Sequence, residues 1–253
     1  MNKLIQRLHF TAFLLCLSLH SLTAQKWFCV AQIGATAYLG DVNERLLWQP
    51  QLNRTAIGGS IAYKALDFMT VRFNVTAGQL SGSDGENATT DWRKLRAFSF
   101  QTPFVETALW TEWDVLEAVN GSDYGDNSRS FSAHLLLGVG VSRIMPKVNF
   151  NEPNPVSEFV GLDKNAVYNR HQVVIPFGVA VKWHINKSSA IRVEATMRKT
   201  FSDYFDGISK SAAANNNDAY LMGSIGFERT LSWGLTGWEK MRFSSARAYC
   251  PQF

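Results

Sequence analysis

The chain has 253 residues, of which 46% are hydrophobic, and its formal net charge is +4. A charge balance this close to neutral gives no indication of a surface built to bind nucleic acid. The chain also contains no unbroken apolar run long enough to cross a membrane as a helix. Any crossing of a membrane therefore has to be made by strands.

The first 24 residues have the pattern of a cleavable secretory signal. Lys3 and Arg7 precede an apolar run that starts at Phe10, and the segment ends in small residues up to Ala24. This apolar run is too short to span a bilayer. We therefore predict a signal peptide over 1–24 and a mature protein that is exported.

Behind the signal, apolar and polar residues alternate with a period of two in a series of segments. In 69–78 the odd positions are apolar and the even positions are polar or small. Around Arg192, Glu194 and Arg198 the polar positions carry charge. Successive side chains of a strand point to opposite faces. One apolar and one charged face is typical of a transmembrane β-barrel with lipid outside, and a soluble β-sandwich is the alternative.

The alternation predicts eight strands, an even number as in single-chain bacterial barrels. They cover 27–39, 55–65, 67–80, 100–116, 131–145, 172–184, 190–201 and 218–231. The predicted fold is all-β, an eight-stranded antiparallel transmembrane barrel over 25–233, followed by a periplasmic C-terminal tail over 234–253.

The connections between the predicted strands alternate in length. The long ones, rich in Asn, Asp, Gly, Ser and Pro, are 40–54, 81–99, 146–171 and 202–217. The turns near Leu66 and at 186–189 are short, whereas the connection at 117–130 is longer than expected. Outer-membrane barrels have long loops outside the cell and short periplasmic turns. This pattern predicts an outer-membrane protein with both termini in the periplasm.

The inner face of the predicted barrel carries many charges. They are Arg72, Glu106, Glu112, Asp114, Lys182, Arg192, Glu194, Arg198 and Glu228. An eight-stranded barrel is filled by its own side chains and leaves no aqueous channel. We therefore expect these charges to pair across the lumen.

Two motifs connect the chain to a known family. One is Tyr38-Leu39-Gly40-Asp41, and the other is the segment 198–209, which has Phe205 and Gly207 at two variant positions. With them, and with Ile175-Pro176-Phe177-Gly178, the chain resembles the PorG-like outer-membrane barrels of Bacteroidota over about 35–230. The matching residues include Tyr38, Gly40, Asp41, Arg198, Asp203, Tyr204, Asp206 and Ser209.

The resemblance implies a non-catalytic anchor or accessory subunit of the type IX protein secretion machinery. Its expected partners are the lipid of the outer membrane and, on the periplasmic side, the ring formed by the lipoprotein PorK and PorN. A barrel filled by its own side chains works through its surfaces, which fits this role. The basic tail residues Lys240, Arg242 and Arg247 are the candidate partner contacts.

Small outer-membrane barrels can also be enzymes that act on lipid A. Ser132 and His134 lie two residues apart on one predicted strand, and Glu106 or Glu112 lies on the preceding one. These residues allow a Ser–His–acid relay. However, they face the predicted lumen, and an enzyme acting on lipid must open to the bilayer. We therefore expect no catalytic role; a small receptor or adhesin, using the loop 146–171, is the other alternative.

Metal binding has one candidate pair of ligands. Asp203 and Asp206 lie three positions apart after a predicted strand, and two such carboxylates can coordinate Ca²⁺. More often, residues of this kind accept hydrogen bonds from backbone amides and cap a turn. His171 and His184 lack metal-ligand spacing. We expect no metal and no cofactor.

The cysteines leave three outcomes open. Cys16 lies in the predicted signal, Cys29 begins the first strand, and Cys250 lies in the tail. Barrel closure makes the first and last strands neighbours, in a compartment that permits disulfides. Cys29 and Cys250 form an internal bridge, or one of them bonds a partner, or both are free thiols.

Overall fold

The computed structural model describes residues 27–40, 42, 52–84, 91–120, 130–151, 157–186, 188–211 and 217–231. The predicted signal peptide 1–24 and the predicted tail 234–253 lie outside the described residues. Within the described part of the chain, no helix is long and apolar enough to cross a membrane.

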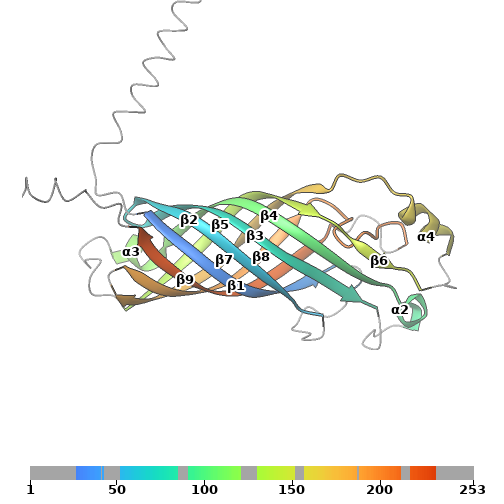
Figure 1. Cartoon of the computed structure of the whole chain (residues 1–253), viewed down its shortest axis with the longest axis horizontal. Helices are drawn as coiled ribbons and strands as arrows, with labels where there is room; N and C mark the ends of the chain where they lie inside the picture. The colour runs from blue at the N-terminus through green and yellow to red at the C-terminus, as the bar shows by residue number, and fades with distance from the viewer. Residues whose placement is uncertain are drawn as a thin grey trace, which may run out of the picture.

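Eight long strands make up the body of the molecule (Figure 1). They are β1 (Trp27–Leu39), β2 (Arg54–Leu66), β3 (Met69–Ser83), β4 (Ser99–Asp114), β5 (Phe131–Ile144), β7 (His171–Asn186), β8 (Ser189–Thr200) and β9 (Ala219–Leu231). The remaining elements are the short strand β6 (Lys147–Asn149) and the helices α2 (Asp91–Arg96), α3 (Val115–Asn120) and α4 (Ser157–Lys164). All eight predicted strands are confirmed, with ends that differ by a few residues.

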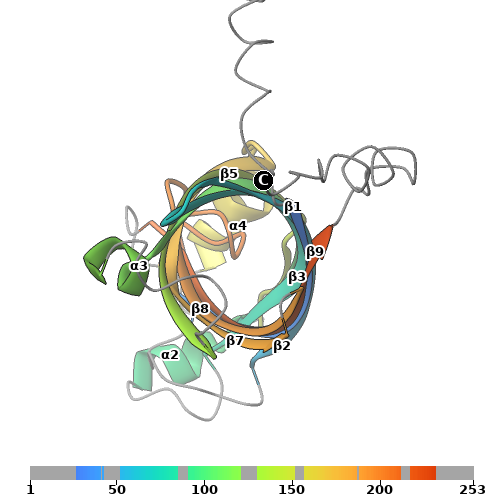
Figure 2. The same cartoon turned by 90° about the vertical axis from the view of Figure 1, so that its left-hand side faces the viewer.

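The eight long strands close into a barrel. Each pairs antiparallel with the next long strand in the chain. β9 then returns to β1, with Leu231 opposite Trp27 and Ala219 opposite Leu39. The view along the barrel shows the resulting ring (Figure 2). Closure leaves none of these strands with a free edge, so the predicted barrel is confirmed and the sandwich is excluded.

The up-and-down path gathers the connections at two ends (Figure 1). We call the turn end the one that holds the start of β1, the turn 67–68, α3 and the end of β9. We call the loop end the one that holds α2, β6, α4 and the segment 201–218. Long connections lie at the loop end, as predicted, and α3 forms the first part of the unusually long connection at the turn end.

The outward face of the barrel is apolar. Val179, near the middle of β7, is 49% exposed. Exposed aliphatic and aromatic side chains recur on the other long strands, among them Ile33, Ile61, Phe73, Leu109, Leu137, Val193 and Ile225. An apolar surface this extensive is unstable in water, and around a closed barrel it matches the hydrocarbon layer of a membrane. The barrel therefore spans a membrane.

The inner face is tightly packed at Gly178. A Cβ atom there would collide with the Ala195 carbonyl oxygen and would lie 2.7 Å from Thr196 Cα. These backbone atoms belong to the strand ladder and cannot turn away, so we expect Gly178→Ala to destabilise the barrel by about 1–3 kcal/mol. Urea unfolding in lipid vesicles measures this loss. Gly161→Ala is the control, because a Cβ there meets nothing within 4 Å; equal stability of both variants would contradict the packing argument.

Candidate functional site

The charged residues predicted for the inner face all lie inside the barrel. Each is 9% exposed or less. Glu112 is the centre of the largest group: its Oε1 lies 2.7 Å from Nε of Arg72 and 2.6 Å from Nη2 of Arg192. Its Oε2 lies 3.5 Å from Nζ of Lys182. A single carboxylate therefore contacts three cations.

Two further carboxylates complete this network. Glu194 contacts Nη1 of Arg72 at 2.7 Å and also accepts a hydrogen bond from Arg192. Glu228 contacts Lys182 at 3.0 Å and Arg192 at 3.1 Å. Three cations and three anions from β3, β4, β7, β8 and β9 thus pair across the lumen. The predicted pairing is confirmed for these six residues, which we call the lumen network, whereas Asp114 caps α3 by accepting the backbone N–H groups of Leu116 and Glu117.

A smaller group lies between the lumen network and the loop end. Arg198, from the family motif, lies 3.5 Å from Glu106. The Tyr220 hydroxyl donates to the same carboxylate at 2.5 Å. The Arg198 guanidinium also lies over the rings of Trp110 and Tyr220, 5.7 and 5.6 Å from their centroids. Stacked and paired in this way, Arg198 has a structural role.

Apolar and aromatic side chains close the loop end. The buried cluster contains Tyr38, Val42, Leu80, Phe98, Phe100, Phe104, Ile144, Val160, Val174, Phe205, Ile208 and Tyr220. Phe205 and Ile208 come from the segment after β8 that carries the family motif, and both are fully buried. We call this cluster, with the segment 202–211, the loop-end plug.

The family motif holds the loop-end plug in place. The Tyr38 hydroxyl lies 2.7 Å from Oδ2 of Asp206 and also contacts Oδ1 of Asp218, so its single proton is shared between two carboxylates. Oδ1 of Asp206 accepts the Ile208 backbone N–H at 2.8 Å. A Cβ at Gly40 would collide with the Tyr38 hydroxyl and Asp218. The two motifs, far apart in sequence, therefore meet at one point.

Helix α4 fastens the end of the same segment. Asp163 accepts backbone N–H groups of Ser209 at 3.3 Å and of Ser211 at 2.9 Å. Tyr204 stacks on Tyr168 with a centroid separation of 4.8 Å and an interplanar angle of 7°. Burial raises the pKa of the Tyr168 phenol above its ordinary value of 10.0, so this ring remains neutral at neutral pH.

The candidate calcium ligands are part of the plug. Asp206 caps a turn by accepting the Ile208 N–H, which is the commoner role of such residues. Gly207 has φ of +81°, a conformation that favours glycine. In the described part of the chain, no three His, Cys, Asp or Glu residues, Asp203 included, form a group suited to a metal ion. Asp41 lies outside the described residues.

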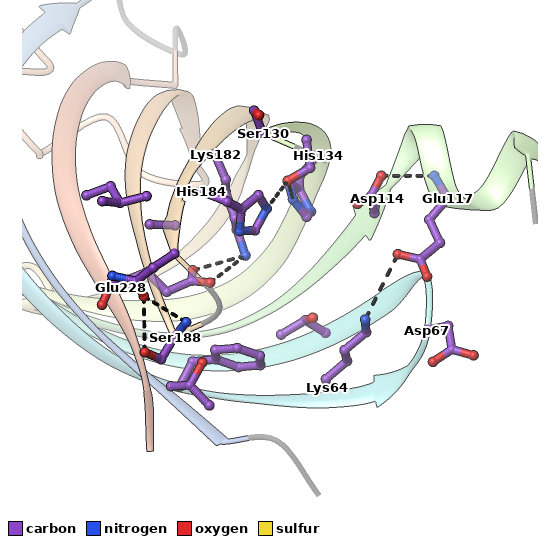
Figure 3. A pocket seen from close by; sticks show the side chains of 18 of the residues that line it. Lys64, Asp67, Asp114, Glu117, Ser130, His134, Lys182, His184, Ser188 and Glu228 are labelled. Carbon is purple, nitrogen blue, oxygen red and sulfur yellow. Dashed lines mark hydrogen bonds and ion pairs between the residues drawn. The ribbon is translucent and has the colours of Figure 1, made fainter. Parts of the chain in front are cut away.

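The turn end holds a cavity of about 590 Å³ (Figure 3). Each of the eight long strands contributes to its wall, with residues that include Phe28, Lys64, Thr70, Asp114, Ser132, Lys182, Ala190 and Glu228. We call this cavity the turn-end cup. Lys182 and Glu228 belong both to its wall and to the lumen network, so the network closes the cup on its inner side.

A serine and two histidines meet in the wall of the cup. Oγ of Ser132 lies 2.9 Å from Nε2 of His134 and 3.3 Å from Nε2 of His184. A relay needs an acid on the other ring nitrogen, but Nδ1 of His134 has no hydrogen-bond partner among the described residues. Glu106 and Glu112 contact arginines instead. The structure thus brings the predicted serine and histidine together without the acid.

Cys29 lies near the turn end, on the outward face of β1. It precedes Val30, which is buried, and its thiol contacts the Arg229 carbonyl at 3.6 Å. Cys250 lies outside the described residues, as do the candidate partner contacts Lys240, Arg242 and Arg247. A bridge between the two cysteines therefore requires Cys250 to reach the outer face of the barrel.

We expect Cys29 and Cys250 to form that bridge, which would stabilise the protein by roughly 2–4 kcal/mol if it is unstrained. Non-reducing electrophoresis with peptide mapping detects the linked pair. A larger, reducible adduct would show a bond to a partner instead. Alkylation of both thiols without prior reduction would eliminate either bridge.

Comparison with known proteins gives one family. The family model described as Domain of unknown function (DUF6089) matches residues 6–234. No curated protein matches the chain.

The chain is also similar to solved structures. For Neisserial surface protein A the identity is 9% and the TM-score 0.44, over 83% of this chain and 98% of that one. For Ail, the attachment invasion locus protein of Yersinia pestis, crystallised with a heparin analogue, the identity is 8% and the TM-score 0.41, over 82% of this chain and 98% of that one. For outer membrane protein W of E. coli the identity is 16% and the TM-score 0.37, over 80% of this chain and 96% of that one. Similarity at this level gives no information about the role of this chain.

Proposed function

This chain belongs to the family described as Domain of unknown function (DUF6089), and we propose that it is a non-catalytic anchor or accessory subunit of the type IX protein secretion machinery in the bacterial outer membrane. The observation that carries the proposal is a barrel blocked in two places, by the lumen network and by the loop-end plug. A blocked barrel offers no path for transport. Its work is therefore done by its surfaces.

The outer membrane is the location that the physical features support. Closed barrels and helices are the structures that satisfy every backbone hydrogen bond in lipid, and this chain has a closed barrel with an apolar outer face. Bacterial single-chain barrels of this kind lie in the outer membrane. The secretory signal predicted over 1–24 would direct export of the chain across the inner membrane.

The turn end is the surface we assign to the periplasm. Trp27 and Leu231, the ends of the described barrel, pair with each other there. An exported chain that inserts from the periplasm keeps its termini on that side. Lys240, Arg242 and Arg247 follow Leu231, the last described residue, in the sequence. These residues are our candidate contacts for PorK-like and PorN-like ring proteins, the partners that the resemblance implies.

The alternative functions have weaker support. A lipid A-modifying enzyme would be favoured by a nucleophile facing the bilayer, but Ser132 and His134 line the turn-end cup inside the barrel. A receptor or adhesin would be favoured by a cavity among the outer loops, but the described loop-end residues pack into a plug.

Co-purification tests the proposal. A tagged chain is extracted from its native host in mild detergent, and its partners are identified by mass spectrometry. We expect PorK-like and PorN-like periplasmic proteins. We also expect their loss from the variant Lys240→Ala/Arg242→Ala/Arg247→Ala, which should be recovered as an intact barrel because the three residues lie outside the strands β1 to β9. Repeated recovery of the intact barrel without any discrete periplasmic partner would contradict the proposal.

A further inference from the structure

The turn-end cup is a cavity of the size that binds ligands in other proteins. Its volume of about 590 Å³ falls in the range of ordinary ligand pockets. It opens at the turn end, and the Lys182–Glu228 pair closes its inner side at 3.0 Å (Figure 3). A ligand therefore has to enter from the side on which the chain leaves the barrel.

The described lining of the cup carries a surplus of negative charge. Its cations are Lys64 and Lys182, and its anions are Asp67, Asp114, Glu117 and Glu228. With the histidines counted as uncharged, two positive and four negative charges give −2. Because Lys182 and Glu228 cancel on the inner side, the surplus lies at the mouth, where Lys64 is 4.0 Å from Glu117. The mouth favours a cationic ligand.

A second observation points to a ligand with polar backbone groups. His134 is only 8% exposed and lines the cup. Its Nε2 is engaged by Ser132, whereas its Nδ1 has no hydrogen-bond partner among the described residues. Buried polar atoms are normally satisfied. A polypeptide supplies both carbonyl and N–H groups to such an atom.

One segment of the chain combines these properties. Residues 232–253 contain Lys240, Arg242 and Arg247 against Glu239, a net charge of +2. This charge is equal and opposite to that of the described lining of the cup. The segment starts at the mouth, because Thr230 of β9 lines the cup. Lys240 lies nine positions beyond Leu231, a distance of up to about 30 Å in an extended chain.

We propose that the turn-end cup binds the basic residues of 232–253 of the same chain when no partner holds them. Covalent attachment gives the segment an effective concentration of order millimolar at the cup, so weak ion pairs suffice. The cup then competes with any partner for Lys240, Arg242 and Arg247. The inference does not rest on which partner that is.

Photo-crosslinking of the purified full chain in detergent, with no partner present, tests the inference. Phe68 is replaced by p-benzoylphenylalanine in one variant and Phe131 in another. Both side chains are exposed near the turn end, at 40% and 45%, but only Phe68 lines the cup. We expect crosslinks from position 68 to peptides of 232–253 and none from position 131. Removing charge by Asp67→Asn/Glu117→Gln should lower the yield several-fold.

A second measurement needs no unnatural residue. Trypsin cleaves after lysine and arginine, so cleavage after Lys240 should be slower in the wild-type chain than in Asp67→Asn/Glu117→Gln. Raising the salt concentration to 1 M, where the Debye length is about 3 Å, should remove the difference. Equal crosslinking from positions 68 and 131 would overturn the inference. Crosslinking and cleavage that are unchanged in Asp67→Asn/Glu117→Gln would overturn it as well. Loss of partners in the co-purification would not, because no partner takes part here.

Discussion

Replacing Glu112 with glutamine is expected to cost on the order of 3–5 kcal/mol of unfolding free energy, because it leaves buried cations without their shared counter-charge. The carboxylate lies 2.7 Å from Arg72, 2.6 Å from Arg192 and 3.5 Å from Lys182. Glutamine keeps the shape of the side chain and removes the charge. Urea unfolding in phospholipid vesicles, followed by tryptophan fluorescence, measures the effect.

Two controls separate charge from packing. Glu158→Gln, on the exposed side of α4, should change the stability by no more than about 0.5 kcal/mol. The double variant Glu112→Gln/Lys182→Gln restores the charge balance of the lumen network and should recover part of the lost stability. A Glu112→Gln variant as stable as the Glu158→Gln variant would show that the lumen network is not held by its charges.

A charge introduced on the outer face should lower the unfolding free energy nearly as much as Glu112→Gln does. Val179→Arg, close to the middle of β7, places a cation in the hydrocarbon layer and is expected to lose about 2–4 kcal/mol. Val181→Arg should have a similar effect. The same vesicle unfolding experiment measures the loss.

Val167 supplies the matched control for the outer face. It is fully exposed and lies beyond the strands, at the loop end. Val167→Arg should therefore leave stability almost unchanged, since its side chain stays in water. Equal tolerance of arginine at Val167 and Val179 would mean that the apolar face of β7 does not contact lipid.

The strands could be predicted from the sequence because both of their faces obey strong constraints. Lipid requires apolar residues at every second position, as at Val179 and Val181, and the lumen requires polar or small ones between them. A shift of one residue would move every side chain to the wrong face. The strand ends were less certain, because the alternation fades outside the membrane, as at the end of β3.

The loop-end plug could not be predicted in the same way. Its contacts join residues far apart in the chain, such as Tyr38 with Asp206 and Asp163 with Ser211. No local pattern encodes such pairings. The sequence alone left calcium binding and turn capping both open for Asp206.

The turn-end cup was only partly visible in the sequence. The spacing of Ser132 and His134 placed both on one face of β5, as the structure has them. The contact of Ser132 with His184 depends on the register between β5 and β7, which places Ser132 opposite Lys182. The two-residue alternation of β7 could have revealed this contact, because it places Ala180, Lys182 and His184 together on the inner face.

The central claim is a membrane-spanning barrel whose turn end faces the periplasm, and cysteine labelling of intact cells tests it most directly. In a background with Cys29→Ala and Cys250→Ala, single cysteines are placed at Val167 and Ser188, which are exposed at opposite ends of the barrel. A membrane-impermeant maleimide should label Val167→Cys in intact cells and Ser188→Cys only after the outer membrane is permeabilised. Labelling of Ser188→Cys in intact cells, alone or together with Val167→Cys, would contradict the account.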